Sequence, residues 1–465
     1  MPSFDVPRHV FREYDIRGVA DRDLRSDFVT ALGRAIGHTL SVGDRTRLAV
    51  GRDCRLSSER LFGALTQGLV EAGIDVIDIG VGPTPQLYFA VHHLGTDGGI
   101  MITGSHNPAE DNGFKIMRGK ASFFGKDIQD LLALVLSDKA HKRATGSVEA
   151  IGVDDAYVAA ITAKIAAPKE PMKVIVDAGN GAGGPLALRC FERIGMSPEA
   201  LFCDMDGRFP NHHPDPTVTK NLEALVDRVR KTGARVGIAY DGDADRLGAV
   251  DETGDVIWGD RLMILFSRAL LAKTPGATIL GEVKCSQTLY DDIAKHGGRP
   301  IMWKTGHSLI KTKMKEEKAL LAGEMSGHLF FADRYFGYDD AIYASMRLVE
   351  LLAADERPIR EMLADVPRTF TTPELRVDCP DEVKFPLVAA VTARFKGMGH
   401  PVVEIDGARI TFPSEGGAPA WGLVRASNTG PVLVLRFEAG SEAALAENRL
   451  AVESVVKEEL AKLRA

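Results

Sequence analysis

The sequence predicts an α/β protein made of three related, mainly parallel α/β domains and a smaller C-terminal α+β domain. Three segments repeat one order of elements: a short apolar strand, a polar or glycine-rich loop, a stretch with helical period and a second apolar strand. Strands that alternate with helices in this way favour parallel sheets covered by helices. Beyond about residue 367 this order gives way to closely spaced strands. A chain of 465 residues is long enough for roughly three or four domains.

The three repeats are placed by their strands. Serine near the helix starts and glycine near the helix ends are the expected capping signals between those strands. In chain order, the opening and closing strands of the repeats lie at 48–50 and 76–79, at 174–176 and 201–202, and at 278–280 and 301–303.

The C-terminal segment carries a different pattern. Asp406-Gly407 is typical of a hairpin turn, and a charged helix is expected from Glu442. The strands predicted here lie at 402–405, 408–412, 422–425 and 432–437. We therefore expect four domains with the boundaries 1–150, 151–255, 256–366 and 367–465.

Composition excludes several classes of protein. The net charge of −7 and the pI near 6.0 argue against a nucleic-acid binder, which usually carries a basic excess. Five cysteines without CxxC spacing indicate a reducing compartment and no zinc site. The N-terminus has no apolar signal core, and no stretch is long enough to span a bilayer. We expect a cytoplasmic protein without nucleic-acid or membrane partners, and its oligomeric state stays open.

A serine loop follows the strand predicted at 99–103. It begins at Gly104 and presents the hydroxyl of Ser105, the imidazole of His106 and several backbone N–H groups together. This combination is what a nucleophilic or phosphorylated serine requires. The alternative is an ordinary Asn-Pro turn with a solvent-facing serine.

An acidic loop follows the strand predicted at 236–240. Asp241, Asp243 and Asp245 stand at alternate positions, and three carboxylates this close repel one another unless a cation lies among them. Hard oxygen ligands suit Mg²⁺ or Ca²⁺ rather than zinc. The sequence therefore predicts a divalent-metal loop.

Three alternatives compete with this interpretation of the acidic loop. The first is a solvated acidic turn. The second is a calcium-binding EF-hand, since Glu252 is the twelfth residue counted from Asp241; Arg246 at the sixth position, where glycine belongs, argues against it. The third is a phosphatase in which Asp241 itself is phosphorylated, which would leave Ser105 without a role.

Three further segments suit a phosphorylated sugar. Glu324, with Ser326 and His328 nearby, can grip a sugar diol. Near the N-terminus, Tyr14 and Arg17 offer a phenol and a guanidinium group. Taken singly, each of these segments is also compatible with an ordinary turn. A loop between two C-terminal strands suits a phosphate dianion through Arg425, Ser427, Asn428, Thr429 and, on the following strand, Arg436.

Taken in order, these motifs resemble those of the α-D-phosphohexomutase family, in its bacterial phosphomannomutase/phosphoglucomutase branch. The resemblance spans essentially the whole chain. The motifs that carry it are Tyr14-Asp-Ile-Arg17-Gly18, Thr103-Gly-Ser-His-Asn-Pro108, Asp241-Gly-Asp-Ala-Asp-Arg246, Gly323-Glu-Met-Ser-Gly-His328 and Arg425-Ala-Ser-Asn-Thr-Gly430.

The resemblance implies four domains around one central cleft, each supplying one loop. Ser105 would be the phosphoserine, and the three aspartates would bind Mg²⁺ together with a phosphoserine oxygen. Arg246 would lie beside the transferring phosphoryl group, while Lys115, Arg17, His328 and His106 are the further catalytic candidates. Sugar and phosphate contacts would come from Tyr14, Arg17, Lys284, His307, Glu324, Ser326, His328, Arg425, Ser427, Asn428, Thr429 and Arg436. A base such as Lys115 would need a pKa lowered by cationic surroundings.

The implied activity interconverts hexose 1-phosphate and hexose 6-phosphate, for mannose and glucose, through a phosphoserine enzyme and a hexose 1,6-bisphosphate. Mg²⁺ and that bisphosphate are the expected cofactors, and phosphosugars are the expected partners. The alternatives are a phosphoglucosamine mutase, a metal-dependent sugar phosphatase using Asp241, and a non-catalytic calcium-binding module.

Overall fold

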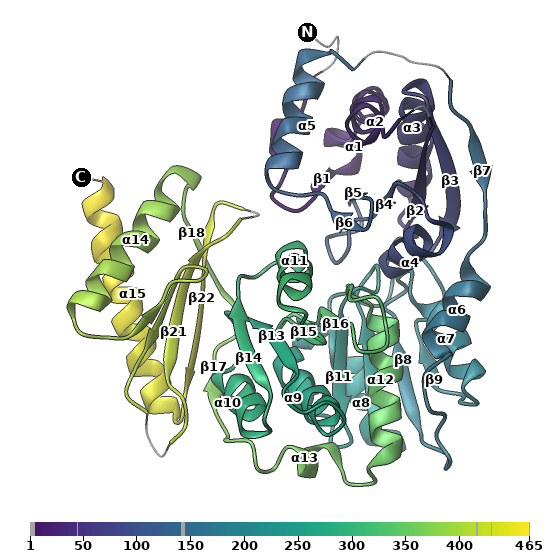
Figure 1. The fold of residues 1–465 in the computed structure, drawn as a ribbon. Helices are drawn as coiled ribbons and strands as arrows, with labels where there is room; N and C mark the ends of the chain where they lie inside the picture. The colour runs from purple at the N-terminus through teal and green to yellow at the C-terminus, as the bar shows by residue number, and fades with distance from the viewer. Residues whose placement is uncertain (1–4, 44, 141–144, 415–416, 429, 465) are drawn as a thin grey trace. The chain divides into compact units, whose positions relative to one another are not determined.

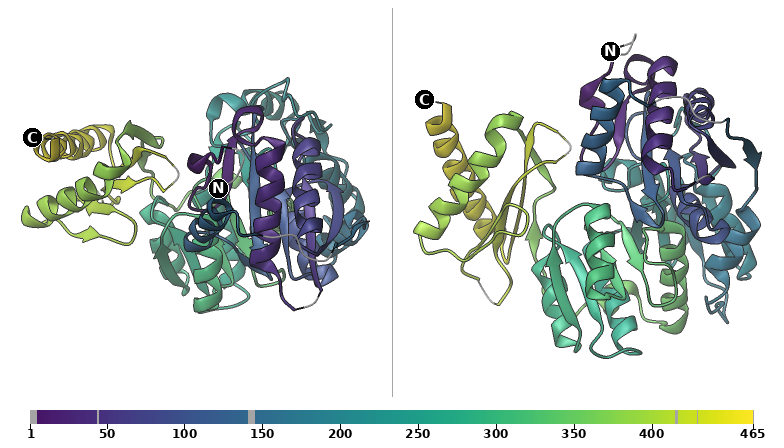
Figure 2. Two further views of the ribbon diagram at one scale, coloured as in Figure 1. Left: turned by 90° about the horizontal axis from the view of Figure 1, so that it is seen from above. Right: turned by 45° about the horizontal axis from the view of Figure 1, so that its top comes forward.

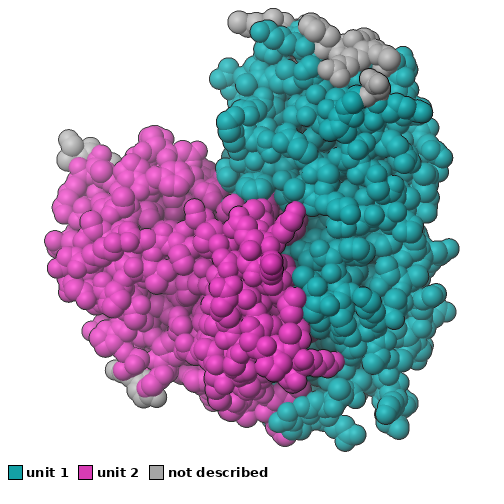
Figure 3. Space-filling model, in the orientation of Figure 1, with its two compact units in different colours: residues 1–262, 326–360 teal, residues 263–325, 361–465 magenta. Residues whose placement is uncertain are grey.

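The structure is a computed structural model that describes all residues except 1–4, 44, 141–144, 415–416, 429 and 465. The chain forms two compact units, which Figure 3 distinguishes by colour. Unit 1 consists of residues 1–262 and 326–360, and unit 2 consists of residues 263–325 and 361–465.

The first sheet of unit 1 has the strand order β1-β5-β4-β2-β3-β7, with β6 beside β5. The pairs β2–β3, β2–β4 and β3–β7 are parallel, whereas β5 runs antiparallel to β1, β4 and β6. Helices α2, α3 and α5 gather beside this sheet in Figure 1. The strands are β1 Ile16–Val19, β2 Thr46–Arg52, β3 Ile74–Val81, β4 Gly98–Ile102, β5 Asp111–Arg118, β6 Ala121–Ser122 and β7 Val148–Ala150. The helices are η1 Arg8–Val10, α1 Ala20–Asp23, α2 Ser26–Leu40, α3 Ser58–Glu71, α4 Thr84–Leu94 and α5 Lys126–Ser137.

The second sheet of unit 1 has the order β12-β11-β10-β8-β9. Strand β10 is parallel to β8, and it forms an antiparallel pair with β11 in which Tyr240 faces Leu247. The strands are β8 Val174–Asp177, β9 Glu199–Leu201, β10 Val236–Tyr240, β11 Leu247–Asp251 and β12 Val256–Ile257. Unit 1 also contains α6 Asp154–Thr162, α7 Gly184–Arg193, η2 Thr219–Leu222, α8 Glu223–Thr232, β16 Leu329–Phe331 and α12 Ala341–Ala354.

In unit 2, strand β13 pairs in parallel with both β14 and β15. These strands are the third repeat of the same α/β pattern, and α10 begins directly after the side-chain cap of Ser286. The elements are β13 Thr278–Glu282, α10 Gln287–Lys295, β14 Arg299–Trp303, α11 His307–Glu317 and β15 Leu321–Gly323. Two helices cross the boundary between the units: α9 Gly259–Leu271 and α13 Ile359–Met362.

The C-terminal part of unit 2 is an antiparallel sheet with the order β17-β22-β21-β20-β19 and with β18 beside β22. Helices α14 and α15 lie along one face of it (Figure 2), and buried side chains such as Phe395, Phe437 and Val452 fill the space between. The elements are β17 Phe370–Thr371, β18 Leu375–Asp378, α14 Asp381–Gly397, β19 Val402–Val403, β20 Ala408–Thr411, β21 Trp421–Ala426, β22 Val432–Ala439 and α15 Glu442–Arg464.

The predicted fold class is confirmed: three α/β segments precede an α+β segment. The first two sheets are more mixed than expected, because the strand after each of their polar loops turns back as an antiparallel hairpin partner. Among the described residues, no helix is long and apolar enough to cross a membrane.

Candidate active site

Ser105 lies in the tight turn between β4 and β5. Its side chain is buried with only 2% exposure, and its φ of +48° is unusual for a residue other than glycine. The Oγ of Ser105 lies 3.1 Å from Oδ2 of Asp241 and 3.2 Å from Nδ1 of His106. The alternative of a solvent-facing turn is therefore wrong, and the serine meets the acidic loop as predicted.

The carboxylates of Asp241, Asp243 and Asp245 are all fully buried in the turn between β10 and β11. Each offers an oxygen within 4.8 Å of the others. Burial and the two neighbouring carboxylates raise the pKa of Asp241 well above its usual range. A solvated turn is excluded by this burial, and an EF-hand is excluded because β10 and β11 form a hairpin instead of flanking helices.

The acidic loop fits a hard divalent cation. Oδ1 of Asp243 and Oδ1 of Asp245 are buried oxygens with no hydrogen-bond partner among the described residues. A buried carboxylate oxygen left in this way is costly unless a cation or donor binds it. The donor set contains oxygen atoms alone, which suits Mg²⁺ or Ca²⁺.

Lys115 brings a positive charge into the same loop from β5. Its Nζ lies 2.7 Å from Oδ2 of Asp243 and 2.5 Å from Oδ2 of Asp245. Burial lowers the pKa of Lys115, but the two carboxylates outweigh burial and hold that pKa well above its usual range. The expectation of a lowered pKa is wrong here, because the nearest charges are anionic.

Arg17 reaches the serine loop from β1. Its Nη1 donates to Oδ1 of Asn107 at 2.9 Å, and its Nη2 donates to Oδ2 of Asp15 at 2.5 Å.

Burial, together with the positive charges of Arg246 and Arg17, lowers the pKa of His106 well below its usual range. The imidazole of His106 is therefore neutral at pH 7 beside the hydroxyl of Ser105.

The sequence analysis missed Arg55, whose side chain binds the backbone of the serine loop. Its fully buried guanidinium donates to the backbone oxygens of Ser105 and Asn107, each at 2.7 Å, and to that of Asp111 at 2.9 Å. Asp53 pairs with the same guanidinium at 3.1 Å. The only signal in the sequence was the charged run that follows the strand at 48–50.

Arg246 and His328 meet through backbone and side chain. Their residues form an isolated antiparallel bridge, and Nε of Arg246 donates to Nε2 of His328 at 3.0 Å. The same Nε lies 3.9 Å from Oδ2 of Asp241, the acceptor of the Ser105 hydroxyl. On the other side of the His328 ring, Nδ1 lies 3.1 Å from Oδ2 of Asp339, a buried carboxylate that the sequence analysis did not single out.

In unit 2, the loops after β13 and β15 bring Lys284 and Glu324 together. Glu282, Glu324 and Glu374 surround Lys284; burial lowers its pKa and these carboxylates raise it above its usual value. The direct ion pair joins Nζ of Lys284 to Oε2 of Glu374 at 3.1 Å. Oε1 of Glu324 accepts from the backbone N–H of Gly306 at 2.8 Å, directly before His307 at the start of α11.

The predicted phosphate loop of unit 2 is braced by charged side chains. Nε of Arg425 lies 3.0 Å from Oδ2 of Asp406, which also accepts from the backbone N–H of Thr305 at 3.1 Å. Lys384, which sequence reasoning missed, donates to the backbone oxygen of Ser427 at 2.5 Å and to that of Gly430 at 3.0 Å. Two buried cations, Arg425 on β21 and Lys384 on α14, therefore lie at this loop.

The remaining predicted residues are placed as follows. The ring of Tyr14 lies 6.5 Å from that of Phe124 in unit 1. Ser326 lies in unit 1 in the loop before β16. Asn428 lies between β21 and β22, Arg436 on β22 donates to the backbone oxygen of Lys284, and Thr429 is outside the described residues.

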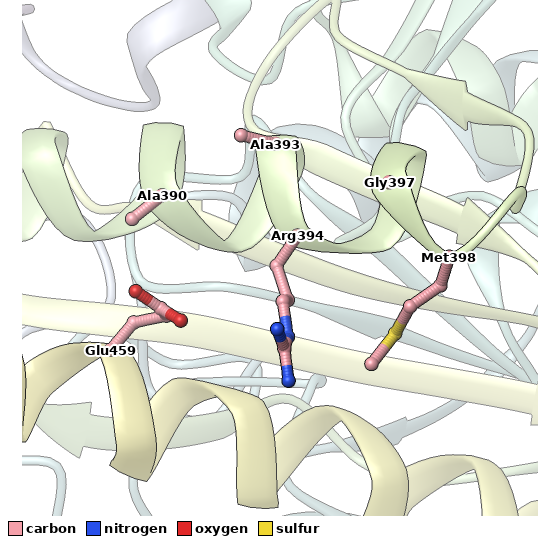
Figure 4. Close-up of a pocket in the computed structure, with 6 residues that line it drawn as sticks. All are labelled: Ala390, Ala393, Arg394, Gly397, Met398 and Glu459. Carbon is pink, nitrogen blue, oxygen red and sulfur yellow. The ribbon is translucent and has the colours of Figure 1, made fainter.

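The described residues also form a hollow of about 670 Å³ between α14 and α15. Figure 4 shows Arg394 of α14 and Glu459 of α15 at this hollow. Its lining residues, Ala390, Ala393, Arg394, Gly397, Met398 and Glu459, include none of the predicted site residues.

Comparison with known protein families gives four consecutive matches, all to phosphoglucomutase/phosphomannomutase domains. The alpha/beta/alpha domains I, II and III match residues 8–141, 155–254 and 258–370. The C-terminal domain of the same family matches residues 374–455.

Individual relatives agree over nearly the full length. The chain is 45% identical to a phosphomannomutase/phosphoglucomutase of Pseudomonas putida over 95% of this chain and 94% of that protein. It is 44% identical to a phosphoglucomutase of Neisseria meningitidis over 95% of each. Among solved structures, a phosphoglucomutase/phosphomannomutase family protein of Burkholderia thailandensis is 42% identical with a TM-score of 0.90, and the match covers 98% of both chains. The chain belongs to the phosphoglucomutase/phosphomannomutase family.

Proposed function

We propose that this chain is a hexose phosphate mutase that interconverts the 1- and 6-phosphates of mannose and glucose through a phosphoserine at Ser105. The observation that carries the proposal is the 3.1 Å contact between Oγ of Ser105 and Oδ2 of Asp241, inside a buried triad of aspartates. The names of the relatives from Pseudomonas and Neisseria support the same activity.

Phosphoryl transfer depends on positioning and charge neutralisation more than on covalent chemistry by the protein. We assign Asp241, Asp243, Asp245 and an oxygen of phosphorylated Ser105 as the ligands of Mg²⁺. When bound, Mg²⁺ supplies positive charge to the phosphoryl oxygens. The guanidinium of Arg246, whose Nε lies 3.9 Å from Oδ2 of Asp241, would add positive charge beside the transferring phosphoryl group.

Each half-reaction exchanges one bond. The P–O bond to Ser105 breaks as a bond forms between phosphorus and the free hydroxyl of the hexose phosphate. That hydroxyl loses a proton, and the oxygen of Ser105 gains one. The resulting hexose 1,6-bisphosphate then reverses its orientation in the site. Its other phosphate returns to Ser105 by the reverse of the same step.

We favour His328 over Lys115 as the proton acceptor. Nε2 of His328 accepts a hydrogen bond from Arg246, so that nitrogen carries a lone pair, which would take the substrate proton once Arg246 turns to the phosphoryl group. The ammonium of Lys115 is held by two carboxylates and is a donor. Arg17 and His106 complete the group of catalytic candidates around the serine loop.

We assign recognition of the sugar and of the non-reacting phosphate chiefly to unit 2. Its two loops with buried cations, at Lys284 and at Arg425, support this assignment. The phosphate-binding set is Arg425, Ser427, Asn428, Thr429 and Arg436, and the sugar-binding set is Glu324, Lys284, His307, Ser326, His328, Arg17 and Tyr14.

The enzyme should accept both glucose and mannose phosphates if no residue contacts the hydroxyl at carbon 2. Glucose and mannose differ only at that carbon, and Glu324 is assigned to the hydroxyls of carbons 3 and 4. We expect kcat/KM for glucose 1-phosphate and mannose 1-phosphate to differ by less than about a thousandfold, roughly 4 kcal/mol. A larger preference would show that a residue contacts the group at carbon 2, and a preference for glucosamine 1-phosphate would favour the phosphoglucosamine mutase.

Intact mass spectrometry tests the phosphoserine directly. Incubating the protein with glucose 1,6-bisphosphate should add one phosphoryl group to the wild type and none to Ser105→Ala, while Ser137→Ala on the surface of α5 should behave as the wild type. The mutase should release little inorganic phosphate. Steady phosphate release that survives Ser105→Ala would instead establish the phosphatase using Asp241, and the absence of any turnover would leave a calcium-binding module.

We also propose that the enzyme works in the cytoplasm with phosphosugars as its partners. All five cysteines are described, and all are free thiols, which supports a reducing compartment.

A further inference from the structure

Both hydrogen-bond donors of Thr84 bind Asp243. The hydroxyl of Thr84 donates to Oδ2 of Asp243 at 2.5 Å, and the backbone N–H of Thr84 donates to the backbone oxygen of Asp243 at 2.9 Å. Thr84 is fully buried and is the first residue of α4. The first N–H groups of a helix have no partner within that helix, so Asp243 satisfies one of them. The sequence analysis did not single out Thr84.

The hydrogen bonds to the side chains of Asp243 and Asp245 occupy one oxygen of each carboxylate. Oδ2 of Asp243 accepts from Thr84 and, at 2.7 Å, from Nζ of Lys115. The same Nζ donates to Oδ2 of Asp245 at 2.5 Å. Oδ1 of both aspartates is buried and has no hydrogen-bond partner among the described residues. Oδ1 is therefore the oxygen that a cation can bind without breaking a hydrogen bond.

Thr84 and Lys115 hold Asp243 with different rigidity. The side chain of threonine is branched at Cβ and has few rotamers, and the backbone of Thr84 is itself bonded to Asp243. The ammonium of Lys115 stands at the end of a flexible four-carbon chain and is shared between two carboxylates. A hydroxyl bound to a carboxylate at 2.5 Å is a strong, charge-assisted hydrogen bond. Thr84 is therefore the residue that fixes the rotation of the Asp243 carboxylate.

We propose that Thr84 is a positioning residue of the metal site, whose hydroxyl holds Oδ2 of Asp243 so that Oδ1 is presented to the cation. This inference rests on the proposed function, in which Asp241, Asp243 and Asp245 bind Mg²⁺. Groups that orient the ligands of a metal typically contribute about 10- to 100-fold to its affinity. Loss of the hydroxyl should therefore weaken metal binding while the fold is kept.

Binding of Mn²⁺ to the full chain, followed by electron paramagnetic resonance, tests the proposal without turnover, because Mn²⁺ prefers the same oxygen ligands as Mg²⁺. Thr84→Val keeps the side-chain shape and the backbone hydrogen bond, and it should raise the Kd for Mn²⁺ about 10- to 100-fold. Thr84→Ser keeps the donor and should stay within about threefold of the wild type. Thr66→Val is the matched control, since Thr66 is buried on α3 and donates to the backbone oxygen of Phe62 at 2.7 Å; its Kd should equal that of the wild type. Intact mass spectrometry should verify that the proteins compared carry the same phosphate content.

Kinetics supply the second readout. In Thr84→Val the Mg²⁺ concentration for half-maximal activity should rise about 10- to 100-fold, and saturating Mg²⁺ should restore most of kcat. An unchanged Kd for Mn²⁺ in Thr84→Val would overturn the proposal, even with a lowered Tm, because the role of Thr84 would then be structural. An equal loss of affinity in Thr84→Ser would overturn it too. A wild type that binds no Mn²⁺ would overturn it together with the Mg²⁺ assignment. Should the wild type bind Mn²⁺ but lack mutase activity, the proposed function fails, and the Mn²⁺ affinities still decide the role of Thr84.

Discussion

The Nζ of Lys115 lies 2.7 Å from Oδ2 of Asp243, and both side chains are buried. This ion pair places an internal cation in the loop that we assign to Mg²⁺. If a divalent cation binds there as proposed, it and Lys115 neutralise the same group of carboxylates, and each should compensate in part for loss of the other.

Replacing Lys115 with methionine should make stability depend on Mg²⁺. Removing one partner of a buried ion pair leaves an uncompensated charge and costs about 3–5 kcal/mol. Thermal unfolding with and without Mg²⁺ should show a larger rise of Tm on adding Mg²⁺ in Lys115→Met than in the wild type. The control is Lys120→Met, since Lys120 is exposed on the same hairpin. An identical Mg²⁺ response in Lys115→Met and wild type would refute a shared site.

The serine loop and the acidic loop touch at Gly242. A Cβ on this residue would lie 2.4 Å from the backbone oxygen of Ser105, so Gly242→Ala should push the two loops apart and lower kcat at least tenfold. Gly63→Ala is the matched control, because a Cβ there meets nothing within 4 Å and lies within α3; it should be neutral or stabilise by up to about 1 kcal/mol. Steady-state kinetics decide the point, and full activity of Gly242→Ala would contradict the close approach.

The ion pair between Glu374 and Lys284 predicts a dependence of stability on pH. The positive charge of Lys284, together with that of Arg376, lowers the pKa of Glu374 from 4.5 to about 2. Because the folded pKa is the lower one, the carboxylate stabilises the fold above about pH 4.5, and this stabilisation is lost as the pH falls from 4.5 toward 2. Glu374→Gln should reduce the free energy of unfolding at pH 7 by about 3 kcal/mol or less, with a smaller reduction at pH 3.5.

Urea unfolding at pH 7.0, 4.5 and 3.5 measures this difference. Glu447→Gln, an exposed position on α15, should change the free energy of unfolding little at any of these pH values. A deficit for Glu374→Gln that is the same at pH 7.0 and pH 3.5 would show that packing, and not charge, explains the loss.

Arg425 should govern affinity for the non-reacting phosphate. Its guanidinium is oriented by Asp406 at 3.0 Å, and a planar fork binds a phosphate better than a lysine does. Arg425→Lys should raise KM for hexose 1-phosphates about 10- to 100-fold, the loss of one charge-assisted hydrogen bond or two, with kcat within a few fold. Arg394→Lys, at the hollow between α14 and α15, serves as control. An unchanged KM in Arg425→Lys would show that Arg425 does not bind the non-reacting phosphate.

The sequence was sufficient for the fold class, because hydrophobic period and glycine-rich turns are local signals. The strand at 174–176 and the helix from Glu442 are found where they were expected. The strand expected at 402–405 ends already at Val403. The four domain boundaries and the central cleft stay predictions.

Candidate groups could also be recognised where one short segment carries several of them, as in the loops of Ser105 and of the three aspartates, which the structure brings into contact; their roles stay predictions. Arg55 and Lys384 were missed because each holds a segment that is distant in sequence, and a single buried charge has no signature until its partner is known. Arg55, for example, binds the backbone of residues 50 or more positions away.

The sequence by itself therefore determined which candidate groups this protein carries: one serine, three aspartates, and lysine and arginine side chains that can neutralise negative charge. Only the tertiary structure decided which of these groups meet and in what ionic state. Lys115 shows the reason, since its charge depends on the carboxylates within 3 Å of it, and Coulomb interactions of buried groups are set by distance and not by position along the chain.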